Sequence, residues 1–107
     1  MNHMGKKEIL IVEDSPEIQL LVNAIIGKTF LINAAGTLSE AKQKIQNNHF
    51  DLILLDVDLP DGDGFKFCAE LKAVASTQQI PVIFLTGKST PIDKVMGFNL
   101  GAEDYIV

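Results

Sequence analysis

The chain has 107 residues, of which 47% are hydrophobic and 21% are charged. These values are typical of one globular domain with a single core. Fourteen acidic against nine basic residues give a net charge of −5, which argues against nucleic-acid binding by this segment. With no apolar stretch of 18 residues and no signal-peptide core, we expect a cytoplasmic protein that does not contact a membrane. Residues 1–7 are interpreted as an N-terminal extension that is partly a tag.

Five short apolar runs predict the strands of a sheet. Four of them are clear, at 9–12, 52–55, 81–85 and 105–107, and a weaker fifth lies at 30–34. The runs are continuous rather than alternating with polar residues. This pattern is typical of strands that a parallel sheet buries on both faces.

Four helical segments separate these runs, and the first two have clear N-terminal caps. Ser15 caps the first helix, and Thr37 caps the second within a capping box that Glu40 completes. The expected helices are, in chain order, an apolar stripe over 18–26, a helix after Thr37 to about residue 47, a helix over 65–75 and a helix over 90–101.

The alternation of strands and helices predicts a single α/β domain. Such units form a parallel sheet with right-handed crossovers and helices on both faces, so we expect a doubly wound, five-stranded sheet. The last run ends at Val107 without a closing helix. We therefore expect one patch of sheet face to be uncovered, unless the natural protein continues.

Acidic and hydroxyl side chains follow three of the predicted strands. Glu13 and Asp14 come after the first, Asp56 after the third and Thr86 after the fourth. In a parallel sheet these strand ends meet at one edge, where ligands bind. Carboxylates about 4 Å apart repel by roughly 4 kcal/mol per pair, and a hard cation such as Mg²⁺ relieves that repulsion. With the acidic charge screened, Asp56 could accept a phosphoryl group and Thr86 could hydrogen-bond to it.

Four segments carry a resemblance to a known family. They are ILIVEDS at 9–15, LILLDVDLPDGDGF at 52–65, PVIFLTG at 81–87 and GAEDYIV at 101–107. Together, in this order and spacing, they resemble the response regulator receiver domain over residues 8–107. The resemblance implies a flavodoxin-like fold with strand order 2-1-3-4-5, and a signalling phosphoacceptor rather than an enzyme.

The resemblance also implies roles for the acidic residues. Asp56 would be the phosphoacceptor, taking its group from a phosphohistidine on a sensor histidine kinase or a histidine phosphotransfer protein. Asp14 would ligate Mg²⁺ directly and Glu13 through water. The backbone carbonyl of Asp58 would be a further metal ligand.

A response to phosphorylation is implied at two other positions. Thr86 would be the switch hydroxyl that moves toward the phosphoryl group, and Tyr105 the switch aromatic that changes rotamer with it. Receiver domains carry a lysine directly after the last strand, which here is the position after Val107, and Lys88 does not replace it. We expect a chain without that lysine and the closing helix to respond poorly, to be less stable and to associate into homodimers.

The same acidic residues allow two other interpretations. Asp56 and Asp58 also resemble the nucleophile and acid/base pair of haloacid-dehalogenase-type phosphatases, but Glu13 and Asp14 lie upstream and these 107 residues leave no room for a cap domain. A degenerate receiver that acts only as a binding module would have lost Asp56 or the acidic pair.

Overall fold

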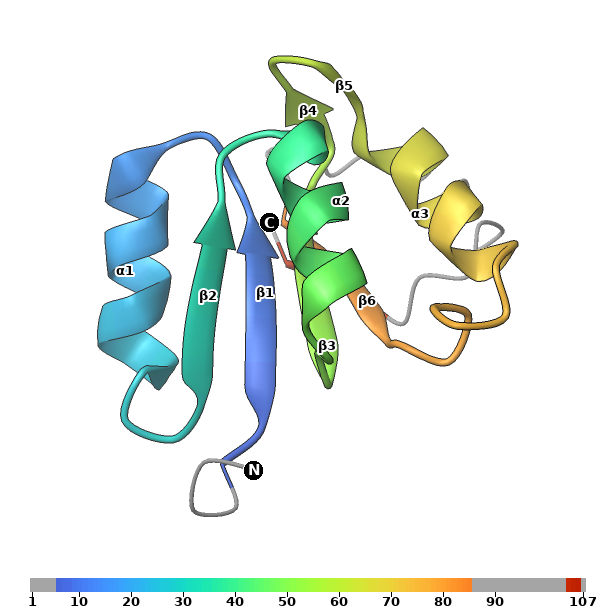
Figure 1. Ribbon diagram of the computed structural model, residues 1–107. Coiled ribbons are helices and arrows are strands. Elements are labelled where there is room, and N and C mark those ends of the chain that lie inside the picture. Colours follow the sequence, from blue (N-terminus) through green and yellow to red (C-terminus); the bar gives the residue numbers. More distant parts are fainter. Residues whose placement is uncertain (1–5, 86–103, 107) are drawn as a thin grey trace.

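Five parallel strands form the central sheet, in the order β2-β1-β3-β6-β7 (Figure 1). The strands are β1 Glu8–Val12, β2 Leu31–Ala35, β3 Leu52–Asp56, β6 Val82–Leu85 and β7 Asp104–Ile106. This computed structural model describes residues 6–85 and 104–106. The five predicted strands are confirmed, and numbering them in chain order gives the expected order 2-1-3-4-5.

In the part of the chain that the structure describes, three helices connect the strands, and local capping explains where they begin. They are α1 Pro16–Ile26, α2 Leu38–Asn47 and α3 Gly64–Lys72. The backbone amide of Ile18 donates to Ser15 Oγ, 3.4 Å away, and that of Glu40 to Thr37 Oγ1, 3.1 Å away. The two predicted caps are therefore confirmed. The helix predicted over 90–101 lies outside the described residues.

The third helix ends earlier than predicted, at Lys72 rather than near residue 75. The hydroxyl of Thr77 donates to the carbonyl oxygen of Leu71 at 2.6 Å. Lys72 Nζ donates to the carbonyl of Ile80, also at 2.6 Å. These hydrogen bonds hold the C-terminus of α3 and the turn that leads to β6. The spacing of apolar residues does not report such bonds and therefore does not predict where α3 ends.

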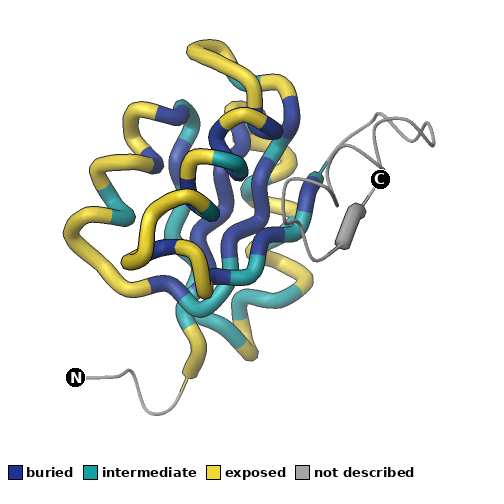
Figure 2. Tube along the Cα trace, turned by 90° about the vertical axis from the view of Figure 1, so that its right-hand side faces the viewer, coloured by how far each residue is buried: buried dark blue, intermediate teal, exposed yellow. Residues whose placement is uncertain are grey.

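Strands β1 and β3 are buried on both faces, as their apolar runs predict, whereas β2 and alternate residues of β6 are only partly buried. Figure 2 shows buried stretches of chain, in dark blue, at the centre of the molecule. One cluster lies between the sheet and helices α2 and α3, and contains Leu10, Val12, Leu55, Phe67 and Leu71 among others. The second lies between the sheet and α1, around Ile9, Ile11 and Leu54.

The apolar stripe predicted for the first helix is only partly used. Val22 and Ile26 pack against the second cluster, whereas Ile18, Leu21 and Ile25 are 40%, 58% and 70% exposed. The stripe is wider than the contact that α1 makes with the sheet. That a closing helix covers this face stays a prediction. Within the described part of the chain, no helix is long and apolar enough to cross a membrane.

A small antiparallel hairpin follows β3 and was not predicted. Its strands, β4 Asp58–Leu59 and β5 Gly62–Asp63, pair as Asp58 with Asp63 and Leu59 with Gly62. Two-residue strands leave no hydrophobic period to recognise in a sequence. The hairpin lies directly between Asp56 and α3.

A buried residue of the sheet and an exposed apolar residue of α1 should differ in how much they stabilise the fold. Leu55 is completely buried in β3, so Leu55→Ala should lower the free energy of unfolding by about 2–5 kcal/mol. Ile25→Ala, on the exposed side of α1, should change it by roughly 0.5 kcal/mol or less. Urea unfolding of both variants measures this difference. Equal losses would show that α1 buries Ile25 in solution.

Candidate functional site

Three carboxylates meet at the edge of the sheet where β1 and β3 end. Parallel pairing runs from Ile9 opposite Leu52 to Val12 opposite Leu55, so the residues that follow these strands are neighbours. One oxygen each from Glu13, Asp14 and Asp56 lies within 4.8 Å of the other two. The convergence predicted from the strand ends is therefore present.

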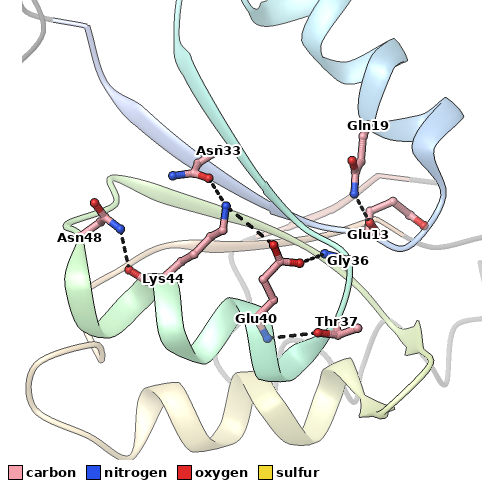
Figure 3. A network of polar contacts seen from close by, with 8 residues as sticks. All are labelled: Glu13, Gln19, Asn33, Gly36, Thr37, Glu40, Lys44 and Asn48. Atoms are coloured by element: carbon pink, nitrogen blue, oxygen red, sulfur yellow. Dashed lines mark hydrogen bonds and ion pairs between the residues drawn. The ribbon is translucent and has the colours of Figure 1, made fainter.

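Glu13 is held in place by its backbone and its side chain. Its amide donates to the carbonyl of Ala35 on β2 at 2.9 Å. Its own carbonyl accepts a hydrogen bond from Gln19 Nε2 of α1 (Figure 3). Its carboxylate accepts one from the Ser15 amide at 3.0 Å. With 4% of its surface exposed, Glu13 is the buried member of the cluster, whereas Asp14 is exposed.

Asp56 is the last residue of β3 and is half-buried. Its Oδ1 lies 3.4 Å from the backbone amide of Asp58, which donates to it. Gly64 packs so close that a Cβ there would collide with the carbonyl oxygen of Asp56, and its amide donates to the carbonyl of Val57 at 2.7 Å. The residue at position 64 must therefore be glycine for the chain to pass behind Asp56.

The site is electrostatically unfavourable without a cation. Burial raises the pKa of Glu13 to about 7; the hydrogen bond from Ser15 opposes this rise, and repulsion by Asp56 and Asp14 adds to it. Burial also raises the pKa of Asp56, again with a contribution from Asp14. Within the described residues, no lysine or histidine forms an ion pair with these three carboxylates.

This donor set fits a hard divalent cation. All three side chains offer carboxylate oxygens, which Mg²⁺ and Mn²⁺ prefer over the nitrogen and sulfur ligands typical of zinc sites. Bringing three such groups together is unfavourable unless positive charge offsets their repulsion. The observation that favours a cation here is the convergence of the three carboxylates; repulsion from Asp56 and Asp14 adds to burial, the larger cause, in raising the pKa of Glu13.

The remaining predicted site residues are placed only in part. Thr86 lies outside the described residues. Tyr105 belongs to β7, where its backbone pairs with Phe84 of β6. The backbone amide of Asp58 donates to the carboxylate of Asp56. That the carbonyl of Asp58 is a metal ligand stays a prediction.

A separate groove of about 530 Å³ lies between α2 and α3, where both helices end. Its walls include Ile45 and His49 on one side and Phe67 and Val74 on the other, and none of the three carboxylates lines it. The chemistry of the acidic edge is therefore not located in this groove.

Comparison with known proteins agrees with the fold and the acidic edge. The family model described as "Response regulator receiver domain" matches residues 9–107. The chain belongs to the response regulator receiver domain family. A receiver domain is a signalling phosphoacceptor of two-component systems rather than a classical enzyme, so the phosphatase interpretation is set aside.

Curated relatives and solved structures are similar to this chain over most of its length. A probable cyclic di-GMP phosphodiesterase of Vibrio cholerae is 38% identical over 106 residues, which are 99% of this chain and 24% of that protein. The chemotaxis response regulator CheY4 of V. cholerae superposes with a TM-score of 0.89 at 28% identity, covering 95% of this chain and 86% of CheY4. The Mn²⁺-bound response regulator Rcp1 superposes with a TM-score of 0.86 at 29% identity, covering 94% and 80%.

The receiver domain is one part of most of these relatives. The chain spans between 13% and 45% of the length of the curated relatives it matches. Its similarity to the Mn²⁺-bound structure supports a divalent metal at the acidic edge, since receiver domains bind such ions.

The pKa of Glu13 predicts how pH affects the stability of the metal-free receiver. A carboxyl whose pKa rises from 4.5 to about 7 on folding favours the folded state when protonated. Its contribution is therefore complete below about pH 4.5 and is lost as the pH rises through about 7. The loss should be at most roughly 3 kcal/mol.

Glu13→Gln isolates this effect, because the amide oxygen can still accept from Ser15 but does not titrate. Urea unfolding in EDTA at about pH 5 and about pH 8 should show a smaller fall in stability for this variant than for the wild type. Parallel stability curves would mean that Glu13 titrates normally in the folded protein.

Proposed function

We propose that Asp56 is the phosphoacceptor of this receiver domain. A carboxylate oxygen of Asp56 attacks the phosphorus of a phosphohistidine, an acyl phosphate forms, and the nitrogen–phosphorus bond breaks to release a neutral imidazole after proton uptake. The observation that carries the proposal is the convergence of Glu13, Asp14 and Asp56 at one sheet edge. Asp56 is the member at the end of the central strand β3 and is open enough to be reached.

The reaction is proposed to depend on Mg²⁺. Asp14 and Asp56 would bind the ion directly, Glu13 through water, and the carbonyl of Asp58 would be a further ligand. When bound, the ion supplies the positive charge that lets an anionic phosphoryl group approach an acidic site. The Ser15 and Asp58 amides keep the Glu13 and Asp56 carboxylates in fixed orientations.

The response to phosphorylation is proposed to involve Thr86 and Tyr105. Thr86, which follows β6 directly, would donate its hydroxyl proton to a phosphoryl oxygen. Tyr105, whose backbone pairs with that of Phe84 in β6, would change its side-chain rotamer. Together they would reshape the surface near β7, and this altered surface would be the signal that other domains recognise.

The partner is proposed to be a sensor histidine kinase or a histidine phosphotransfer protein, acting in the cytoplasm. We propose residues 8–107 as the domain. The output is not fixed by the receiver, since relatives of similar identity are named as a probable cyclic di-GMP phosphodiesterase and as the transcriptional regulatory protein BasR of Escherichia coli. Association into homodimers stays a prediction.

Acetyl phosphate with Mg²⁺ should label the protein at Asp56. In a chain extended past Val107, the acyl phosphate can be trapped by reduction and located by mass spectrometry. Asp56→Asn should lose the label. Asp51→Asn, just before the opposite end of β3, should keep it because Asp51 only accepts from the Glu8 amide and pairs with His49. Full labelling of the Asp56→Asn variant would refute the assignment.

Divalent binding should depend on Asp14. Asp14→Ala should weaken Mg²⁺ or Mn²⁺ binding by about 10–100-fold or more, because the loss of even an outer-shell partner of a metal costs that much. Glu17→Gln is the matched control, since it removes one negative charge from the exposed first turn of α1. Isothermal titration calorimetry measures both. Equal affinity for the wild type and Asp14→Ala would exclude Asp14 as a ligand.

A further inference from the structure

The hairpin after β3 is attached to a helix that is distant in sequence. Asp61, in the turn between β4 and β5, accepts a hydrogen bond from the Leu38 amide at 2.8 Å and one from the Ser39 amide at 3.0 Å. These amides belong to the first turn of α2, 23 and 22 residues away. The two oxygens of one carboxylate thus satisfy two free donors of that helix.

A second contact joins the same two elements. Gly62, the residue after Asp61, lies so close to α2 that a Cβ there would be 2.7 Å from Leu38 Cδ1. Leu38 itself is buried in the main core, and Leu59 of the hairpin packs against the same cluster. The hairpin is therefore seated on the N-terminus of α2.

The first turn of α2 also has a local cap, which serves a different amide from the two that Asp61 accepts. Thr37 Oγ1 accepts from the Glu40 amide, and Glu40 Oε1 accepts from the Gly36 amide at 2.9 Å (Figure 3). Further along the helix, Lys44 Nζ donates to Asn33 Oδ1 of β2 at 2.5 Å. The helix is thus capped and tied to the sheet by its own residues, and it can act as a fixed support.

The other end of the hairpin contacts the phosphoacceptor. Asp58 pairs with Asp63 across the hairpin, and the Asp58 amide donates to Asp56 Oδ1 at 3.4 Å. A displacement of the turn would therefore be transmitted to the backbone of Asp58. Strands of two residues hold little structure by themselves, so external contacts must fix the hairpin.

We propose that Asp61 is a positioning residue for the acidic site: by capping α2 it holds the hairpin where the backbone of Asp58 can serve Asp56 and a bound divalent cation. This inference rests on the proposed metal site. The coupling is reciprocal, because any contact that strengthens cation binding is itself strengthened by the cation to the same degree. Binding of Mg²⁺ should therefore protect the Leu38 and Ser39 amides from exchange with solvent.

A purely structural role for Asp61 predicts a different result. If Asp61 only completed the cap of α2, its removal would resemble loss of the other cap, Thr37. Thr37→Ala is therefore the matched control: it removes a side-chain acceptor from the same helix turn, at a typical cost of about 1 kcal/mol, without loosening the hairpin.

The experiment measures Mg²⁺ affinity by calorimetry and stability by urea unfolding for the wild type, Asp61→Ala, Asp61→Asn and Thr37→Ala. Asp61→Ala should bind Mg²⁺ about 10-fold more weakly, as expected for loss of a residue that orients a ligand. Asp61→Asn keeps one acceptor oxygen and should lose less. Thr37→Ala should lose stability and keep its affinity. Hydrogen exchange should show Mg²⁺-dependent protection of Leu38 and Ser39 in the wild type and Thr37→Ala, and none in Asp61→Ala.

The outcomes separate the inference from the function on which it rests. Failure of the wild type to bind Mg²⁺ would overturn the proposed metal site and this inference with it. Tight binding by the wild type and Asp61→Ala alike would overturn only the role of Asp61. Equal weakening in Asp61→Ala and Thr37→Ala would show that α2 stability, rather than the hairpin, sets the affinity.

Discussion

The pairing register of β1 with β3 is the constraint on which the acidic site depends. Alternate residues of β1 enter different cores: Leu10 packs in the cluster under α2 and α3, and Ile11 in the cluster under α1. A slip of one residue would exchange these faces along the whole strand, so that each closely packed side chain would meet the wrong core. The core therefore fixes the register, and the register sets Glu13 beside Asp56.

The same arrangement sets a balance between stability and function. Three carboxylates at one strand edge oppose folding, since burial and mutual repulsion raise the pKa of Glu13 and of Asp56. The buried strands offset this cost, because each fully buried aliphatic side chain contributes about 1.5–3 kcal/mol. A receiver domain can thus keep an unfavourable site that becomes favourable when a cation occupies it.

Much of this structure follows from local patterns, and the remainder depends on contacts between distant segments. The caps at Ser15 and Thr37 were predictable because each bonds an amide three residues away. Asp61 could be predicted as a turn or cap residue, but not as a partner of α2, because the amides that it accepts from lie more than 20 residues earlier. Similarly, the spacing of Ile25 indicates an apolar stripe but does not reveal how much of it the sheet covers. The acidic edge was predictable because parallel strands bring their carboxyl ends together.

The site therefore combines parts of unequal rigidity. Glu13 and Asp56 continue buried strands, so moving either would disturb the core. The hairpin from Asp58 to Asp63 is largely exposed and consists of two residue pairs, and its bonds to α2 compete with water. If the charge on Asp56 changed, the strand ends would have little freedom to respond, and among the described parts of the site the hairpin would rearrange at lower cost. Its attachment through Asp61 means that such a rearrangement reaches the first turn of α2 directly.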